Sequence, residues 1–367
     1  STPRSNRGAG AGLLAFSATT ISTELGGETG AWIGDRGNIS AENVTLDATA
    51  THLAQGQSTT TQGSLIVTIT SVDSRAVDNG TASVRIGAES GGQGTTVLSR
   101  GAITATASMN STVESQATGR SFSLIGSGSS SQTTASNQSK VKGRIGDNVD
   151  LRAEGGAFGM EIGLEGVARG EATSVGGAIV SAVTATADVD FDSQADFSVG
   201  NNGQVVGAGG VDLTARLNHN GADFLGQNNG QASARGAVGA ARTTDGGFVS
   251  VGTSNIDVDS DSKLKLDVGT TSLTTGGAAD VNITGQHANT SFASLSSAGG
   301  GVVRVATGNI RADVGAGGMA QPTTLVAFRG HVDDGSDEAA HNRNVKAETL
   351  SVSETSMSGV GGGLVNV

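Results

Sequence analysis

The chain has no cysteine and no tyrosine, and its 367 residues include only one tryptophan and two prolines. Without cysteine it can form no disulfide and no thiolate metal site. Flat Trp and Tyr rings commonly supply the apolar surface of sugar-binding clefts, so their scarcity disfavours a glycan cleft. Trp32, the single tryptophan, is expected to anchor a corner of the fold. Glycine is abundant at 59 residues but shows no period of three, which excludes a collagen triple helix.

The chain is acidic, with a formal net charge of −12. We identify no cluster of Lys and Arg that interrupts this charge, so we expect no binding to nucleic acid. No apolar run reaches the length required to cross a bilayer, and we expect no membrane span. Residues 1–7 contain no hydrophobic signal core, which suggests a processed chain or a segment of a longer one.

A glycine-led phrase recurs along the sequence. Gly-Gly-Phe-Val-Ser-Val-Gly-Thr at 246–253 matches Gly-Gly-Val-Val-Arg-Val-Ala-Thr at 300–307. Looser copies begin near Gly12, Gly63, Gly177 and Gly363, and a degraded copy lies near Phe122. The average spacing is about 58 residues, counting the degraded copy. A fixed repeat of this length is typical of stacked architectures.

Two further phrases recur within each repeat. One ends in a glycine turn at Gly34, Gly87, Gly146, Gly200 and Gly269, and the other begins at Val44, Ile103, Val149, Val211 and Val281. Apolar and polar residues alternate in both, which predicts strands with one buried face. A sustained helical period is absent, and the best helical candidate, residues 154–169, carries five glycines.

These patterns predict an all-β fold. We expect a right-handed parallel β-helix (β-solenoid) forming one continuous unit over residues 1–367, built from degenerate repeats of about 58 residues. An assumed length of roughly 20 to 25 residues per coil gives about 15 to 18 coils and a rod on the order of 80 Å. The alternative is an antiparallel sandwich or barrel, which also uses short strands. Its Asn-Gly hairpins are few here, and the repeated order of phrases favours the solenoid.

The ordered series of glycine-pair strand, Ile-Gly-Asp turn, Asn-Val-x-Leu-x-Ala strand and Ser/Ala-rich arm resembles the repeat regions of bacterial secreted adhesins. The similar families are the filamentous-haemagglutinin-like and leukotoxin-like adhesins and autotransporter passengers. The resemblance covers nearly the whole chain. It implies a right-handed β-helix, an extracellular or cell-surface location, and a role in attachment, aggregation or matrix formation.

Acidic side chains form the candidate metal sites. Asp257, Asp259 and Asp261 alternate along one strand, as do Asp188, Asp190 and Asp192, so each set lies on one outward face. A second stretch contains Asp333, Asp334, Asp337 and Glu338 beside a Gly-Ser turn. Such oxygen-rich sets could bind calcium. The alternative is that they are solvated charges that keep sheet edges from aggregating. No other cofactor is expected.

The function expected from this reading is structural or adhesive rather than enzymatic. The expected partners are copies of the chain, associating end to end or laterally, and a host or neighbouring cell surface. An end-to-end filament subunit is a close alternative, since an open coil end can pair with another strand. A β-helix polysaccharide lyase or hydrolase is a more distant one. It would need a carboxylate or basic cluster in a groove lined by aromatics or Arg, and the sequence shows neither.

Overall fold

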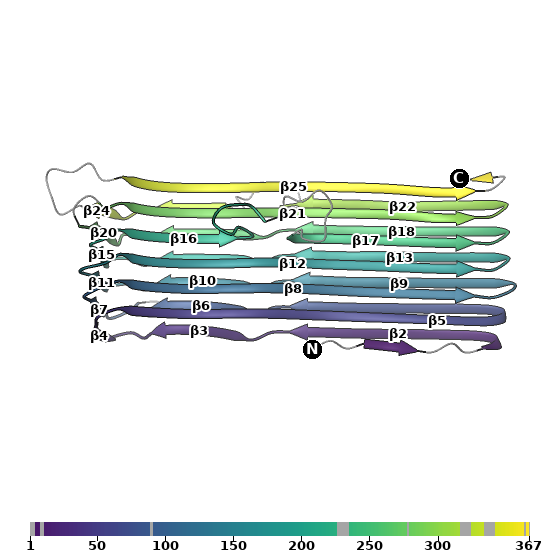
Figure 1. Ribbon diagram of the computed structural model, residues 1–367, viewed down its shortest axis with the longest axis horizontal. Coiled ribbons are helices and arrows are strands. Elements are labelled where there is room, and N and C mark those ends of the chain that lie inside the picture. Colours follow the sequence, from purple (N-terminus) through teal and green to yellow (C-terminus); the bar gives the residue numbers. More distant parts are fainter. Residues whose placement is uncertain are drawn as a thin grey trace.

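The computed structural model describes residues 4–7, 11–88, 91–225, 235–276, 279–315, 324–333, 342–362 and 365–366. These residues form strands and turns and no helix. The strands pair in parallel within one sheet of 14 strands and two sheets of six (Figure 1). The prediction of an all-β chain with parallel sheets is therefore confirmed. In the described part of the chain, no helix has the length and apolarity needed to cross a membrane.

The first sheet contains long outgoing strands and shorter return strands. The outgoing strands are β5 (Val44–Asp78), β8 (Ile103–Phe122), β12 (Phe158–Gly177), β16 (Val211–Leu217) with β17 (Gly236–Gly246), β21 (Val281–Gly300) and β25 (Arg343–Gly362). The return strands are β2 (Ala11–Leu25), the second half of β5, β9 (Gly126–Asn137), β13 (Val180–Phe191), β18 (Val249–Ser260), β22 (Val303–Val314) and β26 (Val365–Asn366). The short strand β1 (Arg4–Arg7) also pairs with β5.

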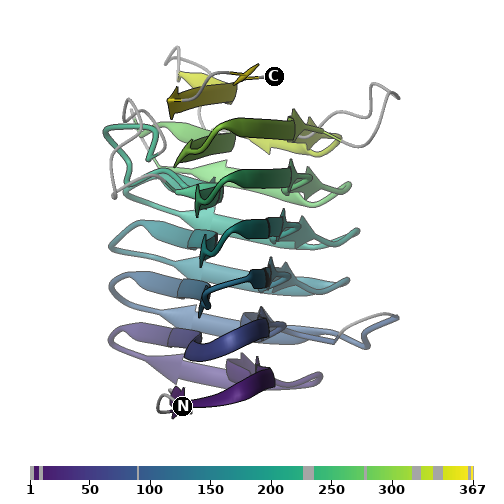
Figure 2. The same cartoon turned by 90° about the vertical axis from the view of Figure 1, so that its right-hand side faces the viewer.

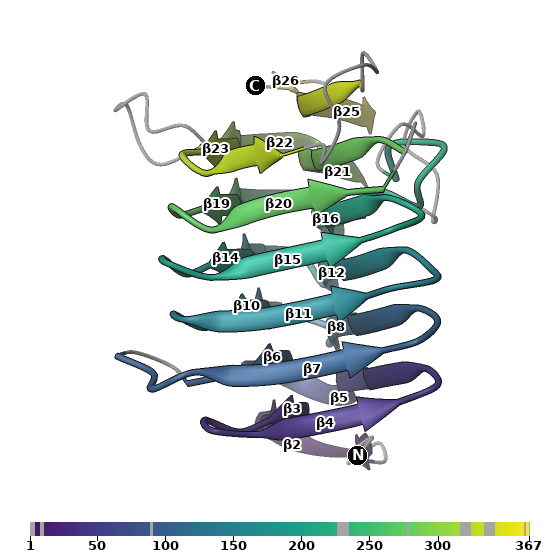
Figure 3. The same cartoon turned by 90° about the vertical axis from the view of Figure 1, so that its left-hand side faces the viewer.

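The second and third sheets contain shorter strands, stacked in chain order (Figure 3). The second sheet consists of β3 (Glu28–Ile33), β6 (Thr81–Ile86), β10 (Lys140–Ile145), β14 (Gln194–Val199), β19 (Lys263–Val268) and β23 (Thr324–Phe328). The third consists of β4 (Asn38–Ala41), β7 (Thr95–Ser99), β11 (Val149–Ala153), β15 (Gln204–Gly207), β20 (Ser272–Thr275) and β24 (His331–Asp333).

One circuit of the chain runs through an outgoing strand, a return strand, the second sheet and the third sheet. Each residue then pairs with its equivalent one repeat further on: Ile103 pairs with Phe158, Phe158 with Val211 and Val211 with Val281. One repeat therefore makes one circuit. The expectation of 20 to 25 residues per coil is wrong, because the outgoing strands are far longer than average strands. Six circuits spaced at about 4.8 Å form a stack on the order of 30 Å, whereas a 20-residue strand extends about 66 Å.

The repeated phrases occupy equivalent positions in successive circuits. Gly177 pairs with Phe122 and Gly246, Gly246 with Gly300, and Gly300 with Gly362. The glycine phrase is thus the turn between an outgoing and a return strand, and the degraded copy near Phe122 belongs to the series. Gly363 and Leu364 lie outside the described residues.

The assignment of Val149 to the same recurring phrase as Val44 and Ile103 is wrong. Val149 lies in the third sheet and pairs with Thr95. The true equivalent of Ile103 is Phe158, at the start of β12. Its strand was overlooked because glycines alternate with its buried apolar residues, as in Phe158-Gly159-Met160.

The interior is apolar where the first half of each outgoing strand faces the second and third sheets. Phe158, Ile162, Leu151, Phe197 and Leu213 are each at most 1% exposed there. Between the second half of the outgoing strands and the return strands, the buried residues are mostly Ala, Ser, Thr and Gly. Small residues therefore predominate in this narrow half, where fewer large side chains such as Leu295 are buried.

Glycines maintain a close approach of the two layers in this narrow half. A Cβ atom added at Gly239 of β17 would lie 2.5 Å from Cγ2 of Val258 in the opposing β18. A Cβ at Gly170 of β12 would lie 2.8 Å from Cγ2 of Val189. Buried hydroxyl groups connect the same layers, as in the 2.9 Å bond that Ser174 Oγ donates to Ser131 Oγ. The narrow half is therefore held by small residues and hydrogen bonds.

Substitution of Gly239 by Ala tests the narrow interior. Overpacking against Val258 should lower the free energy of unfolding by about 1 to 3 kcal/mol. Gly163→Ala is the matched control, because a Cβ there would meet nothing within 4 Å. It should change stability by less than about 0.5 kcal/mol. Urea unfolding followed by circular dichroism measures both. Equal effects of the two substitutions would contradict the close approach of the layers.

A buried ion pair also crosses the narrow half near the turns. Nε of Arg304 in β22 lies 3.3 Å from Oδ1 of Asp245 in β17, and both residues are 2% exposed. The Arg304 guanidinium also donates a 2.7 Å hydrogen bond to Ser297 Oγ. Each charge is compensated by the other, so removing one partner leaves an uncompensated buried charge.

Arg304→Met should therefore lower the free energy of unfolding by about 3 to 5 kcal/mol, because Asp245 stays buried without its partner. The double variant Arg304→Met with Asp245→Leu removes both charges and should recover most of that loss. Denaturant melts of the single and double variants check this. A double variant no more stable than Arg304→Met would refute the pairing.

Candidate functional site: a basic groove on the second sheet

Basic side chains gather on the outer face of the second sheet. Four of the five lysines in the chain are Lys140, Lys142, Lys263 and Lys265, in β10 and β19. Arg85 of β6 and Arg144 of β10 lie on the same face. Their positions alternate with buried residues such as Val141 and Ile145, so the strand pleat points all of them outward.

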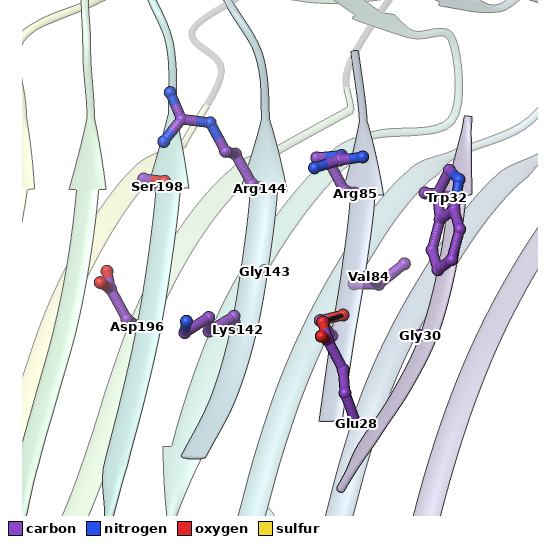
Figure 4. Close-up of a pocket in the computed structure, with 11 residues that line it drawn as sticks. Glu28, Gly30, Trp32, Val84, Arg85, Lys142, Gly143, Arg144, Asp196 and Ser198 are labelled. Carbon is purple, nitrogen blue, oxygen red and sulfur yellow. Dashed lines mark hydrogen bonds between the residues drawn. The ribbon is translucent and has the colours of Figure 1, made fainter. Parts of the chain in front are cut away.

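Strand register brings the central members side by side. Arg144 pairs with Arg85 on one neighbouring strand and with Ser198 on the other. Arg85 in turn pairs with Trp32 of β3. Lys142 lies between Ser83 and Asp196 in the next row. Figure 4 shows these rows crossing the strands, with the Arg144, Arg85 and Trp32 side chains along one row.

The face is hollowed into a groove of about 910 Å³. Glu28, Trp32, Arg85, Lys142, Arg144 and Asp196 provide its charged and aromatic lining. This volume lies within the range of small-molecule sites, about 300 to 1,000 Å³. The groove extends over β3, β6, β10 and β14, so it is open to an elongated ligand.

Trp32 is 62% exposed in the groove. The expectation that it anchors a corner is wrong. Its ring packs over Gly30, where an added Cβ would lie 3.1 Å from Cζ3 of the indole. The absence of a side chain at Gly30 lets the indole lie close to the sheet and expose one face to solvent.

The Lys142 ammonium and the Arg144 guanidinium keep capacity for a ligand. Among the residues that the structure describes, Lys142 and Arg144 form no ion pair with a carboxylate. By contrast, Asp267 at the far side of the sheet is 2.6 Å from Arg329 and 3.8 Å from Lys265. Within the described residues, Lys142 and Arg144 are therefore the groove cations that no carboxylate neutralises by a direct ion pair.

This groove shows that two predictions from the sequence are wrong. Basic residues do cluster in the acidic chain, and a groove lined by Arg and Trp does exist on one strand face. The available signal was the alternation Lys140-x-Lys142-x-Arg144 and Lys263-x-Lys265, which places each series on one face of a strand. The third contributor, Arg85, comes from the preceding repeat, and only the strand register brings it alongside Arg144.

The predicted aspartate rows are brought together in adjacent strands. Asp188 of β13 pairs with Asp257 of β18, and Asp190 pairs with Asp259. In the next circuit Arg311 Nη1 lies 3.2 Å from Asp257 Oδ1, and Nη2 lies 3.6 Å from Asp259 Oδ1. A guanidinium thus occupies the place beside Asp257 and Asp259 that a calcium ion would need.

The remaining metal candidates are separated from this row. Asp261 follows β18, with its backbone amide bonded to Phe191. Asp333 ends β24, whereas Asp334, Asp337 and Glu338 lie outside the described residues. Within the described ranges, no group of three or more His, Asp or Glu side chains is arranged to hold a metal ion.

Crowding of the aspartates changes their acidity. Partial burial, followed by repulsion from Asp188 and Asp259, raises the pKa of Asp190 to about 6. Partial burial and the Asp257 carboxylate also raise the pKa of Asp188. The pKa of Asp259 is raised by burial despite the opposing effect of Arg311. Ionised aspartates in this row therefore destabilise the stack.

Asp190→Asn tests this effect through pH. The pKa of the Asp190 carboxyl is about 6 in the folded state against 3.8 in the unfolded chain. Its protonation therefore favours folding fully below pH 3.8, and this contribution to stability is lost as the pH rises through about 6. The variant should be more stable than the parent at pH 7.5 by up to about 1 kcal/mol, allowing for solvent screening. At pH 3.5 the two should agree, since both side chains are neutral. Thermal melts at the two pH values measure this, and a variant less stable at pH 7.5 would contradict it.

Comparison with known proteins gives no relative for this fold and groove. The chain matches no protein-family model, and it has no significant match among curated proteins or solved structures.

Proposed function

We propose that the chain is a right-handed β-solenoid of an extracellular or cell-surface structural protein, and that it adheres to anionic glycans through the basic groove. The observation that carries the proposal is the pairing of Arg85 with Arg144 beside Lys142 and an exposed Trp32 in one hollow. The adhesin resemblance and the general preference of parallel crossovers for a right-handed path support the remainder.

The charges of the groove favour an anionic ligand. Arg85 and Arg144 lie on adjacent strands, about 4.8 Å apart. Guanidinium groups bind carboxylate and sulfate oxygens through paired, charge-assisted hydrogen bonds. Two of them side by side, with Lys142 one row away, suit a chain that carries repeated anionic groups.

The remaining lining favours a sugar over a simple anion. The exposed face of Trp32 offers a flat apolar surface on which a sugar ring can stack, since sugar rings have apolar C–H faces. Ser83 and Ser198 line the same groove and supply hydroxyl groups suited to sugar hydroxyls. Ser83 Oγ is also 3.1 Å from Oε1 of Glu28. A carboxylated or sulfated polysaccharide satisfies all of these groups together.

The groove lacks the arrangement that a hydrolase requires. Its two carboxylates, Glu28 and Asp196, lie on β3 and β14, which are three strand spacings or about 14 Å apart. Paired carboxylates of glycoside hydrolases are about 5 to 9.5 Å apart. We therefore propose binding without hydrolysis. A lyase, which can use a basic residue to take a proton, is the enzymatic alternative that the Arg and Lys lining leaves open.

A filament subunit is the second form of the structural proposal. In the described chain, β3 and β23 are the outer strands of the second sheet, and β4 and β24 are those of the third. The backbone edge of an outer strand can pair with a further strand. End-to-end stacking of copies would use these edges and leave the groove open, so both forms share the same adhesive site.

Binding to dextran sulfate and to polygalacturonate tests the adhesive site, with neutral dextran as the control ligand. The double variant Arg85→Gln with Arg144→Gln should bind at least about tenfold more weakly, a loss of about 1.4 kcal/mol. Binding by the parent should also weaken with added salt, because salt screens the charges. Biolayer interferometry with immobilised glycan measures these affinities.

Arg152→Gln is the matched protein control. Arg152 is an exposed arginine on β11 of the third sheet, where it contacts Asp150 rather than the groove. Its substitution should leave binding unchanged. Equal losses in the control and the double variant, or strong binding to neutral dextran, would overturn the assignment of the groove. Shortening of the polygalacturonate during incubation would favour the lyase.

A further inference from the structure

The turns between outgoing and return strands form an exposed apolar edge along the stack. Most of the large hydrophobic side chains that the structure leaves exposed lie at this end of the molecule. One member from each of five successive circuits represents it: Leu13 (63% exposed), Leu65 (63%), Leu124 (65%), Ile179 (51%) and Phe248 (59%). Figure 2 looks onto this end, where the turns lie one above another. We call this surface the turn edge.

Backbone hydrogen bonds fix the spacing of the turn edge. The Ile179 amide donates to the Leu124 carbonyl at 3.2 Å, and the Val302 amide donates to the Phe248 carbonyl at 3.0 Å. The apolar side chains therefore repeat at the strand spacing of about 4.8 Å. The edge is as regular as the sheets themselves.

The turn edge carries no charge at its centre, although the chain has a net charge of −12. The nearest outward positions on the return strands are apolar, such as Val180 and Val251, and are followed by a row of hydroxyls, Thr184, Thr253 and Thr307. The aspartates begin only at Asp188, further along the strand. Two such edges can meet without bringing like charges together.

The exposed area is sufficient for a stable interface. About a dozen large side chains, each exposing roughly 80 Å², present on the order of 1,000 Å². A standard protein interface buries about 800 Å² on each partner. Apolar patches of this size are rarely left open on a soluble monomer.

We propose that the turn edge docks against the turn edge of a second copy of this chain, in a two-fold arrangement. Only a surface with the same repeat of about 4.8 Å can match every circuit at once. A second copy of the chain has this repeat because its strands are stacked in the same way. A lipid surface fits less well, because its headgroups have no repeat of about 4.8 Å that would match the stacked turns. The exposed charge flanking the turns is mixed, with Arg120 two positions before Phe122 and the aspartates further along the return strands. The pairing rests on the structural role proposed above, to which it adds a lateral partner.

Sedimentation velocity from low to high micromolar concentration tests the pairing. The parent chain should sediment as a concentration-dependent dimer. The double variant Leu124→Asp with Phe248→Asp should stay monomeric at every concentration, because four charges would be buried in the paired edge. Both positions are exposed turn residues, so the far-ultraviolet circular dichroism and the unfolding midpoint at low concentration should not change.

Leu53→Asp is the matched control, since Leu53 is 44% exposed on β5 outside the turn edge; it should leave the dimer intact. A monomeric parent, or a double variant that still dimerises, would overturn the proposal. Flotation of a monomeric parent with phosphatidylcholine vesicles, lost in the double variant, would overturn it in favour of lipid.

Dextran sulfate binding is measured on the same samples. Loss of dimerisation with retained binding separates this proposal from the adhesive groove.

Discussion

Parallel, in-register pairing between successive circuits is the constraint on which the rest of this structure depends. Each residue lies beside its equivalent from the neighbouring repeats, so any feature of one repeat becomes a row in the stack. Asn282 and Asn344 illustrate this: Nδ2 of Asn344 donates a 2.8 Å hydrogen bond to Oδ1 of Asn282, 62 residues earlier in the chain. The same register forms the groove from Arg85 and Arg144, crowds the aspartates, and aligns the turns. Function in such a chain is a property of rows rather than of single residues.

Much of the fold could be predicted from the sequence, because the glycine turns and alternating strands are local signals. The average repeat of about 58 residues agrees with the circuits seen, in which Ile103 pairs with Phe158 and Val211 with Val281. The predicted circuit length is wrong because the polar arms before the glycine turns continue the outgoing strands. The polar arm after Val44 reads as a loop, yet it is strand, since its Ser, Thr and Gly residues face a narrow interior.

The groove could be predicted only in part. Lys140, Lys142 and Arg144 reveal a basic strand face by their alternation. Their partners on β3 and β6 come from earlier repeats of different sequence. The acidic composition of the whole chain gives no sign that these residues meet. Trp32 was misjudged for a related reason. A lone tryptophan is usually buried in a protein core, and its exposure here depends on Gly30 and on a hollow that exists only when four circuits are stacked.

The two halves of each circuit bury unequal amounts of apolar surface, and this explains why the turn edge is apolar. In the wide half, the outgoing strands face the second and third sheets and bury Phe158, Ile162 and Phe197 in a conventional core. The narrow half is lined mostly by small residues such as Gly239 and Ser174, which bury little apolar surface. Its large side chains are instead on the outside of the turns, where the chain reverses and no layer covers them. Stability of the narrow half then depends on backbone ladders and on the Arg304–Asp245 pair, until an external surface covers the edge. A second copy that covers Leu124 and Phe248 would provide the apolar burial that the closely spaced layers cannot.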